Sequence, residues 1–260
     1  MLSKEEKGLH STKRTKLFGG LREMKMKLIG STTLGVTAAA AMLSSSAALG
    51  DVLYDQSAYT SDYSTTHISV DQEFADFPTY SSYMADDVSF ATGVTINVVS
   101  TYYTMEGNWG PGITQARLNI FAKTGSLPGA GDDPTAGIVV DVTFTNLGDA
   151  WQVTASGLGI DLAAGDYWFA LTPMADFDPF GQAFHYFTAP STLVGDQIAF
   201  RNPSGGFGVG TEWQTIADAY GGPTDANMAL MVEGTVIPAP GALALLGLAG
   251  IAGRRRRRNA

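Results

Sequence analysis

The side chains most able to do chemistry in this chain are its carboxylates. Two carboxylates facing each other across a cleft could cleave a glycosidic bond, one as acid and one as base or nucleophile. Between residues 51 and 253 there are 22 acidic residues, so close pairs also arise without a catalytic purpose. Asp followed by Pro is typical of turns, because the Asp side chain bonds nearby backbone and Pro presets the turn. We therefore interpret most of these pairs as turn residues. Candidate pairs include Asp86/Asp87, Asp132/Asp133 and Asp176/Asp178.

Other catalytic or metal-binding groups are sparse. The chain has three histidines and no cysteine, which excludes thiol catalysis and zinc–thiolate sites. His67 and His185 show no metal-ligand spacing, and each is predicted to be a surface residue of a strand or loop. A serine-hydrolase triad has no Gly-x-Ser-x-Gly motif to hold its nucleophile. The sequence therefore predicts no enzyme. Ca²⁺ is the one cofactor left open, since oxygen ligands in the loops of a β domain suit it.

Aromatic side chains suggest an alternative role in carbohydrate binding or cleavage. Trp109 stands between Gly107 and Pro111, a loop context in which an exposed ring could stack on a sugar. Trp213 is the second candidate for a glycan contact. Trp168 lies in an alternating run and is predicted to be a core residue.

The charge of the chain is unevenly distributed. The whole chain carries a formal charge of −9, with eight Lys or Arg residues before residue 28 and five Arg residues at positions 254–258. The region 51–253 holds only Arg117, Lys123 and Arg201 against its 22 acidic residues, a formal charge of −19. Nucleic acid and anionic membrane surfaces require clustered cations, so neither is an expected partner of this region.

Strand-like runs separated by Gly, Pro, Asn and Asp predict that residues 51–235 form one all-β domain. In one run Val94, Ile96 and Val98 share a face. In another, Arg117 and Lys123 alternate with the apolar side chains, so we predict a half-buried strand with these cations on its outer face. Many short strands favour a single antiparallel β-sandwich or jelly roll. The predicted strands are 92–105, 116–123, 137–145, 150–155, 165–171, 182–187, 197–201 and 227–236.

The first 50 residues have the organisation of a secretory signal peptide. Basic residues precede an uncharged apolar stretch from Leu28 to Leu43, and small residues end at Gly50. We predict a signal-peptide helix, export through the secretion translocon, and cleavage by signal peptidase before Asp51.

The last 25 residues, 236–260, form a second targeting segment. Pro238-Ala239-Pro240 is followed by 13 apolar residues, Gly241 to Gly253, and then by the run Arg254, Arg255, Arg256, Arg257 and Arg258. Thirteen residues are fewer than the roughly 20 that cross a bilayer as a helix. Arginines at the end of an apolar helix tend to stay in the cytoplasm, so the preceding domain is expected to face outward.

This tail resembles the PEP-CTERM sorting signal of exported bacterial proteins, with Ala239 where the family usually has an acidic residue. The resemblance implies processing by an exosortase, transient membrane anchoring by the C-terminal apolar helix, and a place in the cell envelope or extracellular matrix. The segments 84–90, 127–129 and 164–169 are similar to the β-sandwich cargo of such proteins. Together, the resemblance of the tail and that of these segments imply a structural or adhesive, non-enzymatic protein whose partners include the exopolysaccharide.

Overall fold

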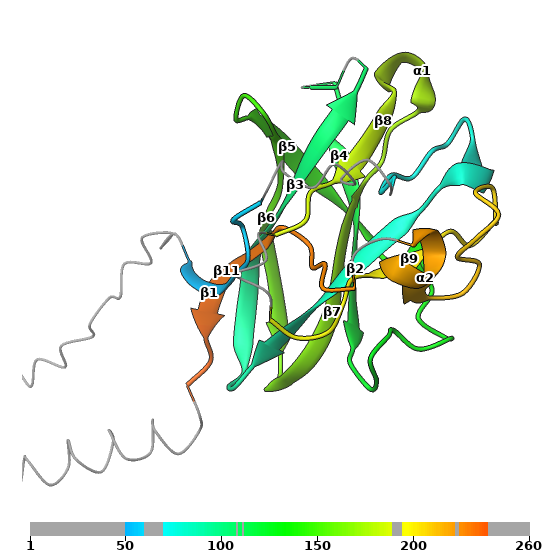
Figure 1. Cartoon of the computed structure of the whole chain (residues 1–260). Coiled ribbons are helices and arrows are strands. Elements are labelled where there is room, and N and C mark those ends of the chain that lie inside the picture. The colour runs from blue at the N-terminus through cyan, green and yellow to red at the C-terminus, as the bar shows by residue number, and fades with distance from the viewer. Residues whose placement is uncertain are drawn as a thin grey trace, which may run out of the picture. The chain divides into compact units, whose positions relative to one another are not determined.

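The computed structural model describes residues 50–59, 70–107, 109–110, 112–188, 194–221 and 224–238 (Figure 1). The predicted signal-peptide helix, the apolar helix of the tail and His67 lie outside these residues. All described residues belong to one compact unit that spans Ser46–Ala260. Within the described residues, no helix has the length and apolar character to cross a membrane.

The predicted all-β fold is confirmed, because the described part forms a single antiparallel sheet of eleven strands. Its order is β1-β11-β3-β6-β5-β4-β7-β2-β9-β10, and β8 pairs with β3 beside this path. The strands are β1 (Asp51–Asp55), β2 (Tyr83–Phe90), β3 (Val94–Glu106), β4 (Gln115–Ala122), β5 (Ile138–Asn146), β6 (Trp151–Leu162), β7 (Gly165–Pro173), β8 (Gln182–His185), β9 (Ala199–Arg201), β10 (Gln214–Thr215) and β11 (Leu230–Val236). The helical turns are η1 (Pro78–Tyr80), η2 (Pro134–Ala136), α1 (Phe177–Phe180) and α2 (Ile216–Tyr220).

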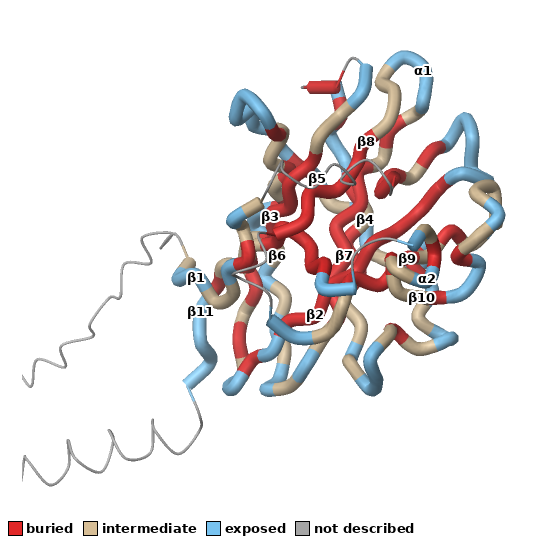
Figure 2. Tube along the Cα trace, in the orientation of Figure 1, coloured by how far each residue is buried: buried red, intermediate tan, exposed pale blue. Residues whose placement is uncertain are grey.

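The sheet curls where strands change partner along their length, as β5 and β2 do. β5 pairs with β4 through residues 138–141 and with β6 through residues 142–146. β2 pairs with β9 through residues 83–85 and with β7 through residues 86–90. The strands therefore wrap around a common interior, and the buried stretches of chain run through their central parts (Figure 2).

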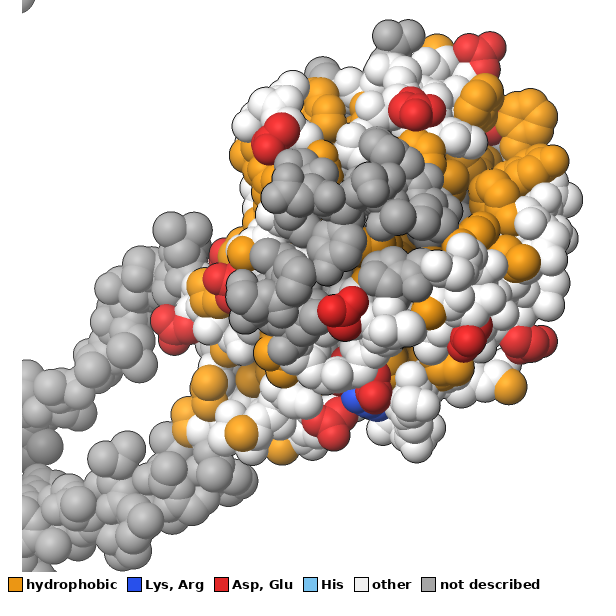
Figure 3. All heavy atoms as spheres, in the orientation of Figure 1, with side chains coloured by type: hydrophobic (Ala, Val, Ile, Leu, Met, Phe, Trp, Pro, Cys, Tyr) orange, Lys and Arg blue, Asp and Glu red, His pale blue; other side chains and the backbone are white. Residues whose placement is uncertain are grey.

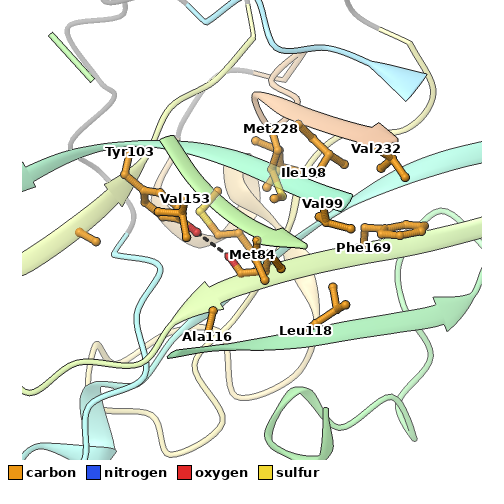
Figure 4. Packing of buried hydrophobic residues seen from close by; sticks show 14 of the residues in the cluster. Met84, Val99, Tyr103, Ala116, Leu118, Val153, Phe169, Ile198, Met228 and Val232 are labelled. Carbon is orange, nitrogen blue, oxygen red and sulfur yellow. Dashed lines mark hydrogen bonds between the residues drawn. The ribbon is translucent and has the colours of Figure 1, made fainter. Parts of the chain in front are cut away.

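The interior is filled by side chains from strands distant in sequence. Met84, Phe169 and Val99 pack together there with residues of β11 and of the segments before β9 and β11 (Figure 4). Burying such a side chain contributes about 1.5–3 kcal/mol relative to leaving it exposed. The core position predicted for Trp168 is confirmed: it lies on the opposite face of β7, in a second apolar cluster with Tyr83.

The alternation predicted along β3 is wrong from Val98 onward. Val94 and Ile96 are buried as expected, but Val99 rather than Val98 is the next fully buried side chain. Against β11, Ile96 and Val98 pair with the consecutive residues Gly234 and Glu233, so Asn97 is the extra residue of a β-bulge. The register with β6 also shifts at this point. One extra residue exchanges the two faces of the strand, which explains the change.

Candidate functional site

An apolar cleft lined mainly by aromatic rings opens on the surface of the domain. Phe77, Tyr80 and Phe177 are 49, 44 and 45% exposed, although large apolar side chains are normally covered. In Figure 3 apolar side chains gather on the same side of the domain as α1 in Figure 1. The cleft has a volume of about 240 Å³. We call it the aromatic cleft, and its lining residues are Phe74, Phe77, Tyr80, Phe177, Gln182 and Phe207.

Ring contacts hold the walls of the aromatic cleft in place. The Phe77 and Phe177 rings meet edge to face, with centroids 6.0 Å apart and an interplanar angle of 86°. Tyr80 and Phe207 do the same at 5.4 Å and 70°. Edge-to-face pairs are favourable beyond the area they bury. Each pair joins the segment around η1 to a segment more than 90 residues later in the chain, so the cleft exists only in the folded protein.

Asp76 connects the same two loops through their backbones. Its carboxylate accepts hydrogen bonds from the amides of Phe177 at 2.9 Å and Asp178 at 3.2 Å. In return, the Asp76 amide donates to the Asp176 carboxylate at 3.2 Å. Burial acts to raise the pKa of Asp76, but the amide hydrogen bonds outweigh it and the pKa lies below its ordinary value. The turn predicted at residues 176–179 is confirmed as α1, and these carboxylates shape the cleft.

The segment before Phe74, which leads to the cleft, is anchored by a buried polar cluster around Asp71. Its carboxylate accepts hydrogen bonds from the hydroxyls of Tyr103 at 2.8 Å and Thr172 at 2.9 Å, and it lies 2.9 Å from Nδ1 of His185. We call Asp71, Tyr103, Thr172 and His185 the Asp71 cluster; all four are fully buried. Because none reaches the surface, the cluster positions the chain and does not contact a ligand.

The prediction that His185 is a surface residue is therefore wrong. His185 lies in β8, its ring centroid is 4.5 Å from that of Tyr103, and Asp71 supplies a hydrogen-bonding partner inside the core. A buried polar side chain is tolerated where such a partner is present. Asp71 comes from a segment without a strand-like pattern, more than 100 residues earlier, so the sequence gives no sign of the contact.

Arg117 of β4 and Lys123 just after it lie on the face opposite Ala116 and Leu118, as predicted, but they are not freely exposed. Their side chains are only 14 and 17% exposed, because acidic residues from covering segments pair with them. Arg117 binds both carboxylate oxygens of Glu73, at 2.5 and 2.7 Å, beside the aromatic cleft. Lys123 bridges Asp87 at 2.5 Å and Asp196 at 2.6 Å. These ion pairs attach the segments around residues 73 and 196 to β4.

The remaining predicted acid pairs have structural roles. The turn predicted at Asp132 and Asp133 is confirmed, since they accept hydrogen bonds from the amides of residues 129 and 135. Asp86 and Asp87 instead lie buried in β2. The Asp86 carboxylate accepts from the amides of Asp87 at 2.9 Å and Met228 at 2.7 Å, and burial raises its pKa well above the ordinary value.

The prediction that Trp109 and Trp213 present exposed rings for glycan contact is wrong. They are 7 and 6% exposed, so neither offers a face to a glycan. Trp109 packs against Phe144, and Trp213 packs against Phe121 while its indole N–H donates to the carbonyl of Asp132 at 2.7 Å. The aromatic cleft was not predicted, because no single stretch of sequence contains it.

The described residues bear only in part on the predicted calcium site and on the predicted sorting signal. Among the described residues, no three His, Asp or Glu side chains gather as metal ligands. Of the predicted sorting residues, Pro238 is the last described residue, whereas Ala239, Pro240 and the run 254–258 lie outside the described part. No protein family, curated protein or solved structure matches this chain. The aromatic cleft and the sequence are therefore the features that bear on function.

Proposed function

We propose that this chain is an exported, non-enzymatic protein of the cell envelope or exopolysaccharide matrix, and that it adheres to matrix polysaccharide through the aromatic cleft. The observation that carries the proposal is the exposure of Phe77, Tyr80 and Phe177 together at one cleft. Contiguous exposed apolar surface marks an interaction site. Rings held by edge-to-face contacts are already in place before a ligand arrives, which lowers the entropic cost of binding.

The chemistry of the cleft suits a sugar polymer. The C–H faces of pyranose rings stack on aromatic rings, while hydroxyl groups need polar partners at the edge of the site. Gln182 lines the cleft, and Asp176 and Asp178 lie on the loop that carries Phe177. Cleavage of the sugar is the less favoured alternative, because a glycosidase needs two carboxylates directed at the bond. The carboxylates of Asp76 and Asp176 instead accept hydrogen bonds from backbone amides.

The placement of the cleft agrees with attachment through the tail. β1 begins at Asp51, where signal peptidase is expected to cut, and Asp51 pairs with Gly234 of β11, the strand that leads into the tail. β1 and β11 lie at the lower left of Figure 1, and α1 of the aromatic cleft lies at the upper right. A tail held in a membrane would leave the cleft on the side facing away from that membrane.

The finer fold, the export and the processing of the chain are proposed from its sequence. We propose that the curled sheet is a β-sandwich or jelly roll, that the secretion translocon exports the chain, and that an exosortase-type enzyme recognises residues 238–240 and the segment after them. The formal charge of −19 in residues 51–253 suits a solvated position outside the cell.

A matched pair of variants tests the adhesive role. The full chain with Phe77→Ser and Phe177→Ser is compared with a chain carrying Val52→Ser and Val139→Ser, which are exposed apolar residues outside the cleft. Sedimentation with the purified exopolysaccharide measures binding. We expect the cleft variant to bind at least tenfold more weakly, about 1.4 kcal/mol, and the control to bind like the native chain. Equal binding by both variants, with circular dichroism showing both folded, would refute the proposal.

A further inference from the structure

A second, larger apolar opening lies between β4 and β6, beside the start of β5. Its volume is about 610 Å³, within the range of about 300–1,000 Å³ typical of ligand sites. It shares no lining residue with the aromatic cleft. We call it the β4–β6 groove. Its apolar lining includes Ile120, Ile138, Ile160, Leu162 and Tyr167, and Ile138 is among the most exposed large apolar side chains described.

The groove is open because β5 leaves β6 part-way along. β5 pairs with β6 as far as Ala155 and then crosses to β4. In the described chain, the rest of β6, residues 156–162, pairs with β3 on one edge only. Gly157 and Gly159 adopt left-handed backbone angles there, with φ of 71° and 62°, and regular pairing is interrupted at this point. Such an edge beside apolar side chains can receive a further segment of chain.

The described part of the chain ends one strand away from β6, which forms one wall of this groove. Val236 pairs with Val94 of β3, and Val94 pairs on its other side with Leu162, which lines the groove. One residue later, the Ile237 amide donates to the carbonyl of Gly93 at 2.7 Å. A Cβ placed on Gly93 would touch both the Ile237 side chain and the Leu162 carbonyl. At the point where the chain leaves the domain, only β3 therefore separates β11 from β6, the strand that contributes Leu162 to the groove.

The sequence beyond Pro238 fits the groove in polarity and charge. Residues 241–253 contain no charged side chain, and they are followed by five arginines. The groove is mainly apolar, and the carboxyl-bearing residues Asp132 and Asp133 line part of it. Amide and hydroxyl hydrogen bonds from Thr135 lower the pKa of Asp133, so that carboxylate stays negative at neutral pH. Two residues, 239 and 240, separate the described end from the apolar segment.

We propose that the apolar segment Gly241–Gly253 of the same chain occupies the β4–β6 groove whenever it is not in a membrane, with the following arginines directed toward Asp132 and Asp133. The groove then shields from water a segment that would otherwise promote aggregation of the exported protein. This inference goes beyond the proposed adhesion and does not depend on it, because it concerns a different surface.

Cysteine cross-linking tests the inference cleanly, because the native chain has no cysteine. Ile138→Cys is combined, in separate full chains, with Leu243→Cys, Leu246→Cys or Leu248→Cys, and each chain is oxidised mildly without lipid. A disulfide requires Cα atoms within about 7 Å, so its formation reports proximity. Phe77→Cys in the aromatic cleft, paired with the same tail positions, is the control.

We expect at least one Ile138 pair to form an intramolecular disulfide in most molecules, at tenfold or more the yield of its Phe77 control. Equal yields in the two series would overturn the proposal. Disulfide-linked dimers would also overturn it, since they would place the tail of a second copy in the groove. As a measurement without cysteines, hydrogen exchange at Ile160 and Leu162 should speed up when residues 239–260 are removed; unchanged exchange would contradict the inference.

Discussion

The Asp71 cluster makes a quantitative prediction about what supports the aromatic cleft. Replacing Asp71→Ala leaves Tyr103 with the Leu171 carbonyl as a second acceptor, at 2.7 Å. It removes the acceptor of the Thr172 hydroxyl, the acceptor of the Met84 amide and the partner of His185 Nδ1. Each buried polar group left without a partner costs about 1–3 kcal/mol, so the three groups together cost about 3–9 kcal/mol. That is a large share of the roughly 5–15 kcal/mol that stabilises a domain.

Urea unfolding followed by tryptophan fluorescence measures this loss. With a slope of about 2 kcal/mol per molar urea, the midpoint should fall by about 1.5–4.5 M. Asp55→Ala is the matched control, because Asp55 is exposed and bonds only its neighbour Ser57 among the contacts found for its side chain. Its effect should stay within about 0.5 kcal/mol. If Asp71→Ala were as stable as this control, the cluster would not be the anchor that we describe.

Three further predictions concern an ion pair of β4, a buried carboxylate of β2 and a glycine at the end of α1. Arg117→Met leaves the half-buried Glu73 carboxylate without its bidentate partner and should cost about 2 kcal/mol in urea unfolding; no loss would show that the pair is dispensable. Burial raises the pKa of Asp86, so the folded state holds a proton that the unfolded chain releases. This contribution to stability is complete below about pH 4 and is lost as pH rises toward the folded pKa. Asp86→Asn should flatten that part of the stability–pH curve, and an unchanged curve would contradict the assignment. Gly181→Ala would drive a Cβ into a backbone carbonyl of β3, whereas Gly157→Ala meets open space at a similar positive φ. Gly181→Ala should therefore lower the melting temperature by several degrees more than Gly157→Ala, and equal melting temperatures would show that the close approach is relaxed.

The sequence predicts the strands well where the pattern is local. Alternation in residues 94–105 and 116–123 predicts β3 and β4, and the turn chemistry of Asp132 and Asp133 gives the turn at η2. The bulge at Asn97 escapes such reasoning, because it depends on how β6 and β11 pair with β3 from either side. The sandwich, the signal peptide and the sorting tail stay predictions.

The aromatic cleft could not be predicted, for a related reason. Phe77, Phe177 and Phe207 are separated by 30 to 130 residues, and none stands in a motif that distinguishes it from a core residue. Trp109 shows the opposite error, since its Gly- and Pro-rich surroundings suggest exposure while the fold buries its ring against Phe144. Which aromatic rings reach the surface depends on long-range packing.

The central claim is that the tail delivers this protein to the envelope and that the aromatic cleft holds it to the matrix. The most direct measurement is fractionation of cells that carry the native chain, the Phe77→Ser/Phe177→Ser chain, or the chain without residues 236–260. We predict that the native chain stays with the matrix, that the cleft variant reaches the surface but washes off, and that the truncated chain is lost from the envelope. Retention of the cleft variant in the washed matrix at the native level would contradict the account.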